Sequence, residues 1–232
     1  MIDIHSHILY SIDDGASNEE VSLKMAKIAV EDGITEIIAT PHITEFSDWN
    51  KIFLTRNILQ DKIYKTGLNL RLYLGGEVPF GMLSEGYQPV TLANSEFILV
   101  EFMHGGIKVP DNAQDIFRRF LKKGYKIIIA HPERNFFFLK NKERLKDLIL
   151  PGVFLQATAM SFKGSFGKSI QLFSADLLKN EMIDFIATDA HDNVYRIPQM
   201  SFLLKSGKNK KYYKLLDKIL NENPEIIFSN GK

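Results

Sequence analysis

Residues Met1–Gly15 read MIDIHSHILYSIDDG, a short run of apolar and acidic residues followed at once by His5 and His7. Side chains two apart on a β-strand point to the same face, so the strand predicted at Ile2–Ile4 directs both imidazoles to one side. Either the two histidines simply follow a first strand, or they begin a site that distant residues complete. The start lacks the basic patch and long apolar run of a leader sequence, so we expect none.

The composition is that of a globular protein of 232 residues, with 45% hydrophobic and 25% charged residues. The formal net charge of +1 gives no reason to expect a nucleic-acid partner. The apolar runs are shorter than the roughly 20 residues of a membrane span, so we expect no membrane insertion and a cytoplasmic location. Cysteine is absent, which excludes disulfides, thiolate metal sites and a cysteine nucleophile.

Seven short apolar runs alternate with longer segments of helical periodicity. The predicted strands are Ile2–Ile4, Glu36–Ala39, Leu70–Leu74, Phe97–Val100, Lys126–Ala130, Val153–Leu155 and Ile183–Ala187. The predicted helices span about 17–33, 48–65, 111–123, 142–150, 168–180 and 210–221. This alternation predicts an α/β fold with a parallel sheet, and seven repeats favour closure into a barrel. Pro79–Asn94 is predicted as a loop, and no boundary divides the single domain expected over 1–232.

Most of the predicted strands are followed by a side chain that can bind a metal. These residues are His5 and His7, His42, Glu77, Glu101, His131, and Asp189 with His191. Only the sixth strand lacks one, and it offers Gln156 and Thr158 instead. In a parallel barrel all strand carboxyl ends open on one face, where functional sites are built. We therefore expect these side chains to converge there as a metal site.

Taken singly, each of these residues is more often structural, but the joint pattern at six of seven strand ends favours metal binding. Imidazole and carboxylate ligands without thiolate suit zinc, manganese or iron(II). Eight ligands exceed what one catalytic ion needs, so we expect two or three ions. Asp14 is a candidate ninth ligand, with Asp13 as its rival. His104 follows Glu101 in a glycine-rich loop and is left out of the ligand set, although it could serve as a general acid.

The motifs HSH, TPH (40–42), AHPER (130–134) and TDAH (188–191), with a glutamate after the third strand, resemble the polymerase and histidinol phosphatase (PHP) superfamily. MIDIHSH, DDG, LVEF and IAHPER are most similar to its bacterial manganese-dependent tyrosine-phosphatase branch of capsule and exopolysaccharide synthesis. The resemblance extends from Met1 to about Pro198 and implies a distorted seven-stranded barrel with a trinuclear metal centre.

Carried over by position, the resemblance implies one ion on His5, His7, Glu77 and Asp189. It further implies a second ion on Glu77, Glu101 and His131, and a third on His42, His191 and Asp14. It also implies that Arg134 and Arg196 bind the substrate phosphate, a role that suits their planar guanidinium groups.

The implied activity is hydrolysis of phosphotyrosine by a metal-activated hydroxide. The implied substrate is a phosphotyrosine-bearing protein tail, such as that of a bacterial tyrosine autokinase. A phenolate leaves without a strong general acid because its pKa is about 10. Two alternatives stay open: a small-molecule phosphatase of the histidinol-phosphatase type, and a metal-binding regulator without turnover.

Overall fold

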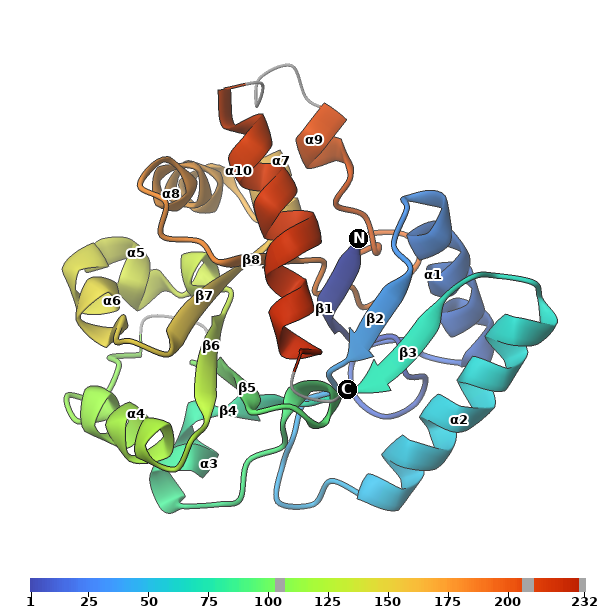
Figure 1. The fold of residues 1–232 in the computed structure, drawn as a ribbon, viewed down its shortest axis with the longest axis horizontal. Coiled ribbons are helices and arrows are strands. Elements are labelled where there is room, and N and C mark those ends of the chain that lie inside the picture. Colours follow the sequence, from blue (N-terminus) through green and yellow to red (C-terminus); the bar gives the residue numbers. More distant parts are fainter. Residues whose placement is uncertain (103–106, 206–210, 230–232) are drawn as a thin grey trace.

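A computed structural model of the chain describes residues 1–102, 107–205 and 211–229, and within them it contains an α/β fold (Figure 1). The strands are β1 (Ile2–Ser6), β2 (Glu36–Ala39), β3 (Arg71–Leu74), β4 (Glu77–Pro79), β5 (Phe97–Glu101), β6 (Lys126–Ala130), β7 (Val153–Thr158) and β8 (Phe185–Ala187). They form a three-stranded sheet in the order β1-β2-β3 and a five-stranded sheet in the order β4-β5-β6-β7-β8. Every pair is parallel, as predicted.

The two sheets do not form the single closed barrel of seven strands that the sequence predicted. Isolated bridges connect them at two places, between Ser6 and Ala190 and between His42 and Glu77. The described strands number eight because the third predicted run continues into a further strand, β4, that belongs to the other sheet. The strand prediction is therefore confirmed in its alternation and direction, and corrected in its count and closure.

The break between β3 and β4 has a steric cause. A Cβ atom on Gly75 would lie 2.7 Å from Leu92 Cδ2, and one on Gly76 would lie 2.5 Å from Ile43 Cγ1. Only glycine allows the backbone to approach its neighbours that closely. The chain thus leaves the three-stranded sheet at this point and places Glu77, which is buried, at the start of β4.

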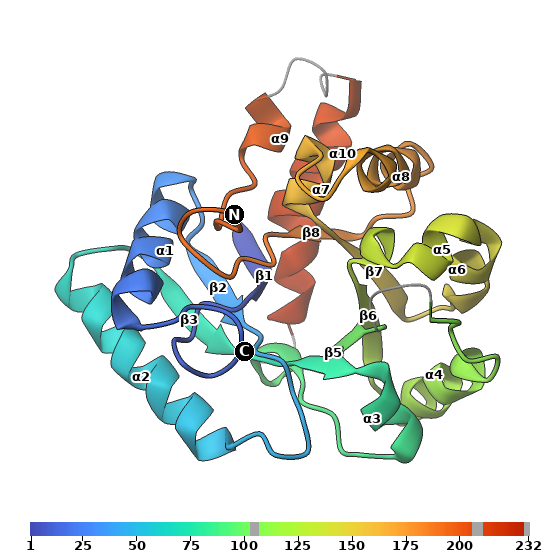
Figure 2. The same ribbon diagram turned by 180° about the vertical axis from the view of Figure 1, so that it is seen from behind.

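Helices surround the strands on the outside, with α1 and α2 beside the three-stranded sheet in both views (Figures 1 and 2). The helices are α1 (Glu19–Glu31), α2 (Trp49–Lys65), α3 (Phe80–Glu85), α4 (Ala113–Lys122), α5 (Phe136–Lys140), α6 (Lys142–Leu148), α7 (Ala159–Lys163), α8 (Lys168–Lys179), α9 (Phe202–Lys205) and α10 (Tyr213–Asp217). Shorter turns are the 3₁₀-helices η1 (Leu92–Asn94), η2 (Pro132–Arg134) and η5 (Asn223–Ile227), and the π-helix η4 (Lys218–Glu222).

Most predicted helices are present, and their first turns show why. Asn18 accepts a hydrogen bond from Val21 N at the start of α1, and Asp48 accepts one from Lys51 N at the start of α2. The loop prediction for Pro79–Asn94 was wrong, because this segment contains α3 and η1, and α3 buries two apolar side chains. The last predicted helix is described only from residue 211 onward and ends in η4.

The inward faces of the strands pack into an apolar cluster that spans both sheets. Its members are Ile4, Ile38, Leu92, Phe97, Leu99, Ile128, Ala130, Phe185, Ala187 and Ile227, all 3% exposed or less. This cluster fills the interior between the strands. The polar residues that follow the strands therefore lie next to a layer of tightly packed apolar side chains. Within the described residues, no helix combines the length and apolar character required to cross a membrane.

Candidate metal centre

The structure brings together all nine side chains that the sequence predicted as metal ligands. They are His5, His7, Asp14, His42, Glu77, Glu101, His131, Asp189 and His191. These residues form four overlapping groups, and within each group the candidate ligand atoms lie within 4.8 Å of one another. The convergence follows from the topology, because the residues leave the carboxyl ends of parallel strands or the loops that begin there.

Four ligand atoms form the most buried part of the centre. His5 Nε2 and His7 Nε2 lie 3.2 Å apart. Glu77 Oε2 lies 3.4 Å from each imidazole nitrogen, and Asp189 Oδ1 lies 3.5 Å from each. An ion that bonds its ligands tetrahedrally at about 2.1 Å holds them about 3.4 Å apart. Each of these five distances is therefore close to the ligand-to-ligand distance around such an ion.

Hydrogen bonds behind the two imidazoles decide which nitrogen faces the centre. His5 Nδ1 donates to Gln156 Oε1 over 2.9 Å, and His7 Nδ1 donates to Asp13 Oδ2 over 2.7 Å. In the neutral imidazoles both Nε2 atoms then present lone pairs to one another. The buried Glu77 Oε2 beside them accepts no hydrogen bond from any described residue. Two facing lone pairs beside a buried carboxylate oxygen are an arrangement that a divalent cation stabilises.

Two further histidines contact the same glutamate, His131 at Oε1 and His42 at Oε2, and both lie near Glu101. His131 Nε2 lies 2.8 Å from Glu77 Oε1 and 3.9 Å from Glu101 Oε1. His42 Nδ1 lies 3.0 Å from Glu77 Oε2 and 3.8 Å from Glu101 Oε2. Glu77 therefore touches two groups at once, the position that a bridging carboxylate requires.

A third group settles which aspartate of the DDG motif faces the centre. Asp14 Oδ1 lies 3.4 Å from His42 Nε2 and 3.4 Å from His191 Nε2. His191 Nδ1 donates to the backbone carbonyl of Asp189 over 3.0 Å, which leaves its Nε2 free to face Asp14. The rival Asp13 instead accepts from the back of His7, so the geometry makes Asp14 the candidate ligand.

Both predicted arginines reach the centre through Asp189. Arg134 and Arg196 donate to its Oδ2 atom, Arg196 over 2.7 Å. The Oδ1 atom of the same carboxylate faces His5 and His7. The Arg134 guanidinium also lies over the Phe166 ring, 4.6 Å from its centroid. The arginines thus lie at the margin of the cluster, next to the ligand atoms.

The charges of the cluster compensate one another. Burial opposes ionisation of Glu77 and Asp189, but the neighbouring imidazoles outweigh it and hold the pKa of both carboxyls well below the usual range. Burial likewise opposes a charged His7, yet its bond to Asp13 raises the pKa of His7 well above normal. Burial, reinforced by the Glu77 carboxylate, raises the pKa of Glu101 to about 7. The surroundings therefore favour the charged, cation-binding form of Glu77 and Asp189, whereas Glu101 loses its proton only near neutral pH.

Two of the strand-end residues adopt backbone conformations that are uncommon for residues other than glycine. His131 has φ 30° and Asp189 has φ 50°. Such conformations persist when the surrounding structure enforces them, and they occur most often at functional sites. Here they turn each side chain from the end of its strand into the cluster.

Two supporting residues carry roles that the sequence did not assign. Gln156 was noted only as a strand end without a ligand, but it orients His5. Asp3, fully buried, accepts from Thr188 N and Thr188 Oγ1 and so fixes the segment that leads into Asp189. The signal for Asp3 was an acid in the middle of an apolar strand. His104 lies outside the described residues.

The chain resembles known proteins along almost all of its length. The family model for capsular polysaccharide synthesis, CpsB/CapC, matches residues 1–229. The tyrosine-protein phosphatase YwqE of Bacillus subtilis is 34% identical over 99% of this chain and 92% of its own length. The putative tyrosine-protein phosphatase CapC of Staphylococcus aureus is 32% identical over 100% of this chain and 92% of its own length.

A solved protein structure also resembles this fold closely. One chain from the crystal structures of YwqE from Bacillus subtilis and CpsB from Streptococcus pneumoniae, described as unique metal-dependent tyrosine phosphatases, superposes with a TM-score of 0.88. It is 34% identical, and the match covers 99% of this chain and 95% of that one. The chain described here belongs to the CpsB/CapC family of capsular polysaccharide synthesis proteins.

Proposed function

We propose that this chain is a metal-dependent tyrosine-protein phosphatase that acts in capsular or exopolysaccharide synthesis. The observation that carries the proposal is the set of four buried ligand atoms from His5, His7, Glu77 and Asp189, spaced 3.2–3.5 Å apart in the five distances given above. Membership of a family whose members include tyrosine-protein phosphatases supports the reaction class.

The proposed cofactor is two or three divalent ions, with manganese expected first and iron or zinc as alternatives. His5, His7, Glu77 and Asp189 would hold one ion, and Glu77 would share a second with Glu101 and His131. Asp14, His42 and His191 would hold the third. When bound, such ions stabilise charge on phosphate oxygens and lower the pKa of water toward neutrality.

The residues of the chain itself supply phosphate binding and orientation. Arg134 and Arg196 both end within hydrogen-bond reach of Asp189 Oδ2, so a phosphate beside that carboxylate would meet two guanidinium groups. Planar guanidinium groups bind phosphate oxygens in pairs and stabilise the charge that spreads over them during transfer.

An accessible mouth supports a protein substrate over a metabolite. The Asp14 side chain is 65% exposed and the His42 side chain is 34% exposed, although both face the ligand cluster. The neighbouring loops carry Phe46 and Tyr195, which are 85% and 81% exposed and could contact an incoming chain. A tyrosyl group also leaves without a strong general acid, because its pKa is about 10.

The proposed partner is a phosphotyrosine-bearing protein tail, such as that of a bacterial tyrosine autokinase. A kinase of this kind needs ATP, so we place the reaction in the cytoplasm. We also propose that residues 1–232 act as one domain. The bridges at Ser6–Ala190 and His42–Glu77, and the apolar cluster shared by both sheets, support that view.

The test is a substrate panel before and after metal removal. Purified protein is dialysed against EDTA and assayed with a phosphotyrosine peptide, a phosphoserine peptide and histidinol phosphate, with and without added manganese. We expect chelation to abolish activity, manganese to restore it, and phosphotyrosine to give the highest kcat/KM. Thiol alkylation should change nothing, because the chain has no cysteine. Full activity after chelation would contradict the proposal, and preference for histidinol phosphate would favour the small-molecule alternative.

A further inference from the structure

Strand β3 has a free edge. It ends the three-stranded sheet, and among the described residues β2 is the one strand that pairs with it. Arg71 N donates to Thr35 O and Gly75 N donates to Ala39 O, both on the β2 side. Because successive residues of a strand alternate their hydrogen-bonding groups between the two sides, the groups of Leu72 and Leu74 point away from β2.

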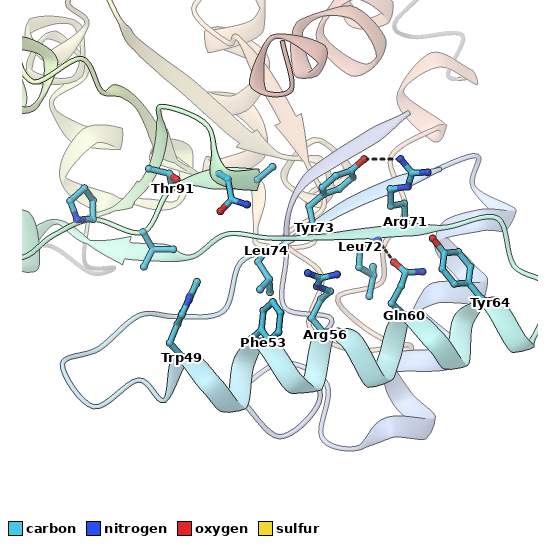
Figure 3. Close-up of a pocket in the computed structure, with 14 residues that line it drawn as sticks. Trp49, Phe53, Arg56, Gln60, Tyr64, Arg71, Leu72, Tyr73, Leu74 and Thr91 are labelled. Carbon is cyan, nitrogen blue, oxygen red and sulfur yellow. Dashed lines mark hydrogen bonds between the residues drawn. The ribbon is translucent and has the colours of Figure 1, made fainter. Parts of the chain in front are cut away.

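A side chain of α2 takes the place of a neighbouring strand along part of this edge. Gln60 Nε2 donates to Leu70 O over 2.9 Å. Gln60 Oε1 accepts from Leu72 N over 2.6 Å (Figure 3). The next pair along the edge, Leu72 O and Leu74 N, has no hydrogen-bond partner among the described residues. Leu72 is only 2% exposed, and backbone groups in such surroundings are normally paired.

This edge borders a cavity of about 700 Å³. Its walls are one stripe of α2, the edge of β3 and residues 89–94 (Figure 3). The α2 stripe consists of Trp49, Phe53, Arg56, Gln60 and Tyr64. The spacing of three or four residues keeps these side chains on one helix face.

Both charged residues in the described lining of the cavity are arginines, Arg56 and Arg71. Glu36, Glu222 and Glu225 line a second pocket that shares Arg71. Arg56 Nε is buried and has no hydrogen-bond partner among the described residues, and the Arg56 guanidinium lies 5.5 Å from the Phe53 ring centroid. An anionic group that entered the cavity would find an arginine donor without a partner, beside aromatic rings that offer apolar contact.

We propose that this groove binds an extended acidic segment of the phosphotyrosine protein, which adds to β3 as a further parallel or antiparallel strand. Its backbone pairs with Leu72 O and Leu74 N, and its acidic side chains meet Arg56 and Arg71. Leu74 precedes Glu77 by three residues, or at most about 10 Å of chain, so the groove ends near the level of the metal ligands. The inference rests on the proposed function, because it treats the bound segment as part of the substrate.

Trp49 offers a direct readout, because it is the sole tryptophan of the chain and lines the groove. The probe is a short unphosphorylated peptide that alternates glutamate and valine, titrated against the full chain while tryptophan emission is followed. We expect saturable change with this peptide. A peptide that alternates lysine and valine should give none, and neither should the acidic peptide after N-methylation of alternate residues, which blocks strand pairing.

Matched variants on the same helix separate the groove from general charge. Arg56→Gln removes a guanidinium that lines the groove, and Lys65→Gln removes a charge from an exposed position of α2 outside it. We expect Arg56→Gln to weaken peptide binding about tenfold, the factor for one charge-assisted hydrogen bond, and Lys65→Gln to leave it unchanged. Equal effects of the two variants would overturn the proposal.

Kinetics connect the groove to the reaction and distinguish the two possible failures. A phosphotyrosine peptide that carries the acidic extension should have a lower KM than one with a serine–valine extension, at the same kcat. Arg56→Gln should abolish that difference.

If phosphotyrosine peptides are hydrolysed without any effect of the extension, the groove proposal is wrong and the proposed function stands. If none is hydrolysed with manganese present, the proposed function fails. Trp49 emission that changes with protein concentration alone would instead assign the groove to a second copy of the chain.

Discussion

The Nδ1 atom of His7 donates to Asp13 over 2.7 Å, and this bond turns the Nε2 atom of His7 toward the shared ligand cluster. Asp13 also accepts from Gly15 N and His42 N, so one carboxylate fixes both the loop and the imidazole. Carboxylates placed behind metal-binding histidines commonly tune the affinity of the site. Asp13 and Asp14, adjacent in the sequence, therefore make different contacts: Asp13 orients His7, and Asp14 faces His42 and His191.

Substitution of the two aspartates should separate these roles. We expect Asp13→Asn to keep the full number of ions at saturating manganese but to bind them about 10–100-fold more weakly, because the imidazole loses its orienting charge. Asp14→Asn should lower the number of bound ions by one. Metal content and calorimetric titration measure both quantities. A lost ion in Asp13→Asn together with full metal content in Asp14→Asn would reverse the assignment.

Arg196 should affect the reaction without affecting metal content. Arg196→Ala removes a donor beside Asp189 Oδ2, and we expect kcat/KM for a phosphotyrosine peptide to fall about 10²–10³-fold with metal content near wild type. Glu77→Ala, which removes the carboxylate that we propose to bridge two ions, should lose bound metal and turnover together. Arg118→Ala, at an exposed position of α4, is the control. Unchanged kinetics in Arg196→Ala would show that this arginine does not contact the phosphate.

The glycine pair before Glu77 should be intolerant of a side chain. Gly76→Ala places a Cβ atom 2.5 Å from Ile43 Cγ1, and overpacking of this kind destabilises by about 1–3 kcal/mol. Because Glu77 is the next residue, we expect weaker metal binding as well as a lower Tm. Gly81→Ala, where a Cβ would meet nothing within 4 Å, is the matched control. Equal thermal stability of the two variants would contradict this account of the break between β3 and β4.

Asp184 should make folding stability depend on pH. Burial raises the pKa of its carboxyl above 3.8, although a 2.8 Å bond from Leu155 N partly opposes the rise. The folded chain then holds this proton more tightly than the unfolded chain, so the contribution of Asp184 to stability falls as pH rises from 3.8 through the folded value. Asp184→Asn keeps an acceptor for Leu155 N without the charge.

We therefore expect Asp184→Asn to be more stable than wild type at neutral pH, with an advantage that shrinks as the pH falls toward about 4. Urea denaturation at a series of pH values, with manganese held constant, gives the difference directly. A variant that is less stable than wild type at neutral pH would show that Asp184 is stabilised as a carboxylate.

The convergence of the candidate ligands was predictable from the sequence because most of them follow a recognisable strand. His5 and Asp189 lie 184 residues apart, yet each ends or follows an apolar run whose direction the alternation of strands and helices fixes. Local spacing could not separate Asp13 from Asp14, because both follow the same turn. Their difference depends on where His7 and His191 lie around the loop.

The closure of the sheet could not be predicted in the same way. The run from Leu70 to Glu77 looks continuous, and the glycine pair that divides it does so through contacts with Ile43 and Leu92, which come from other segments. Gln156 illustrates the same limit, because its role depends on a hydrogen bond to His5, 151 residues away. Contacts between distant segments determine the break between β3 and β4 and the role of Gln156. The residue types that follow each strand, in contrast, can be read from the local sequence.

Anomalous diffraction from crystals grown with manganese tests the central claim most directly. The account predicts a peak at bonding distance, about 2.1 Å, from His5 Nε2, His7 Nε2, Glu77 Oε2 and Asp189 Oδ1. A catalytically active, manganese-loaded crystal with no anomalous peak among these four atoms would contradict it.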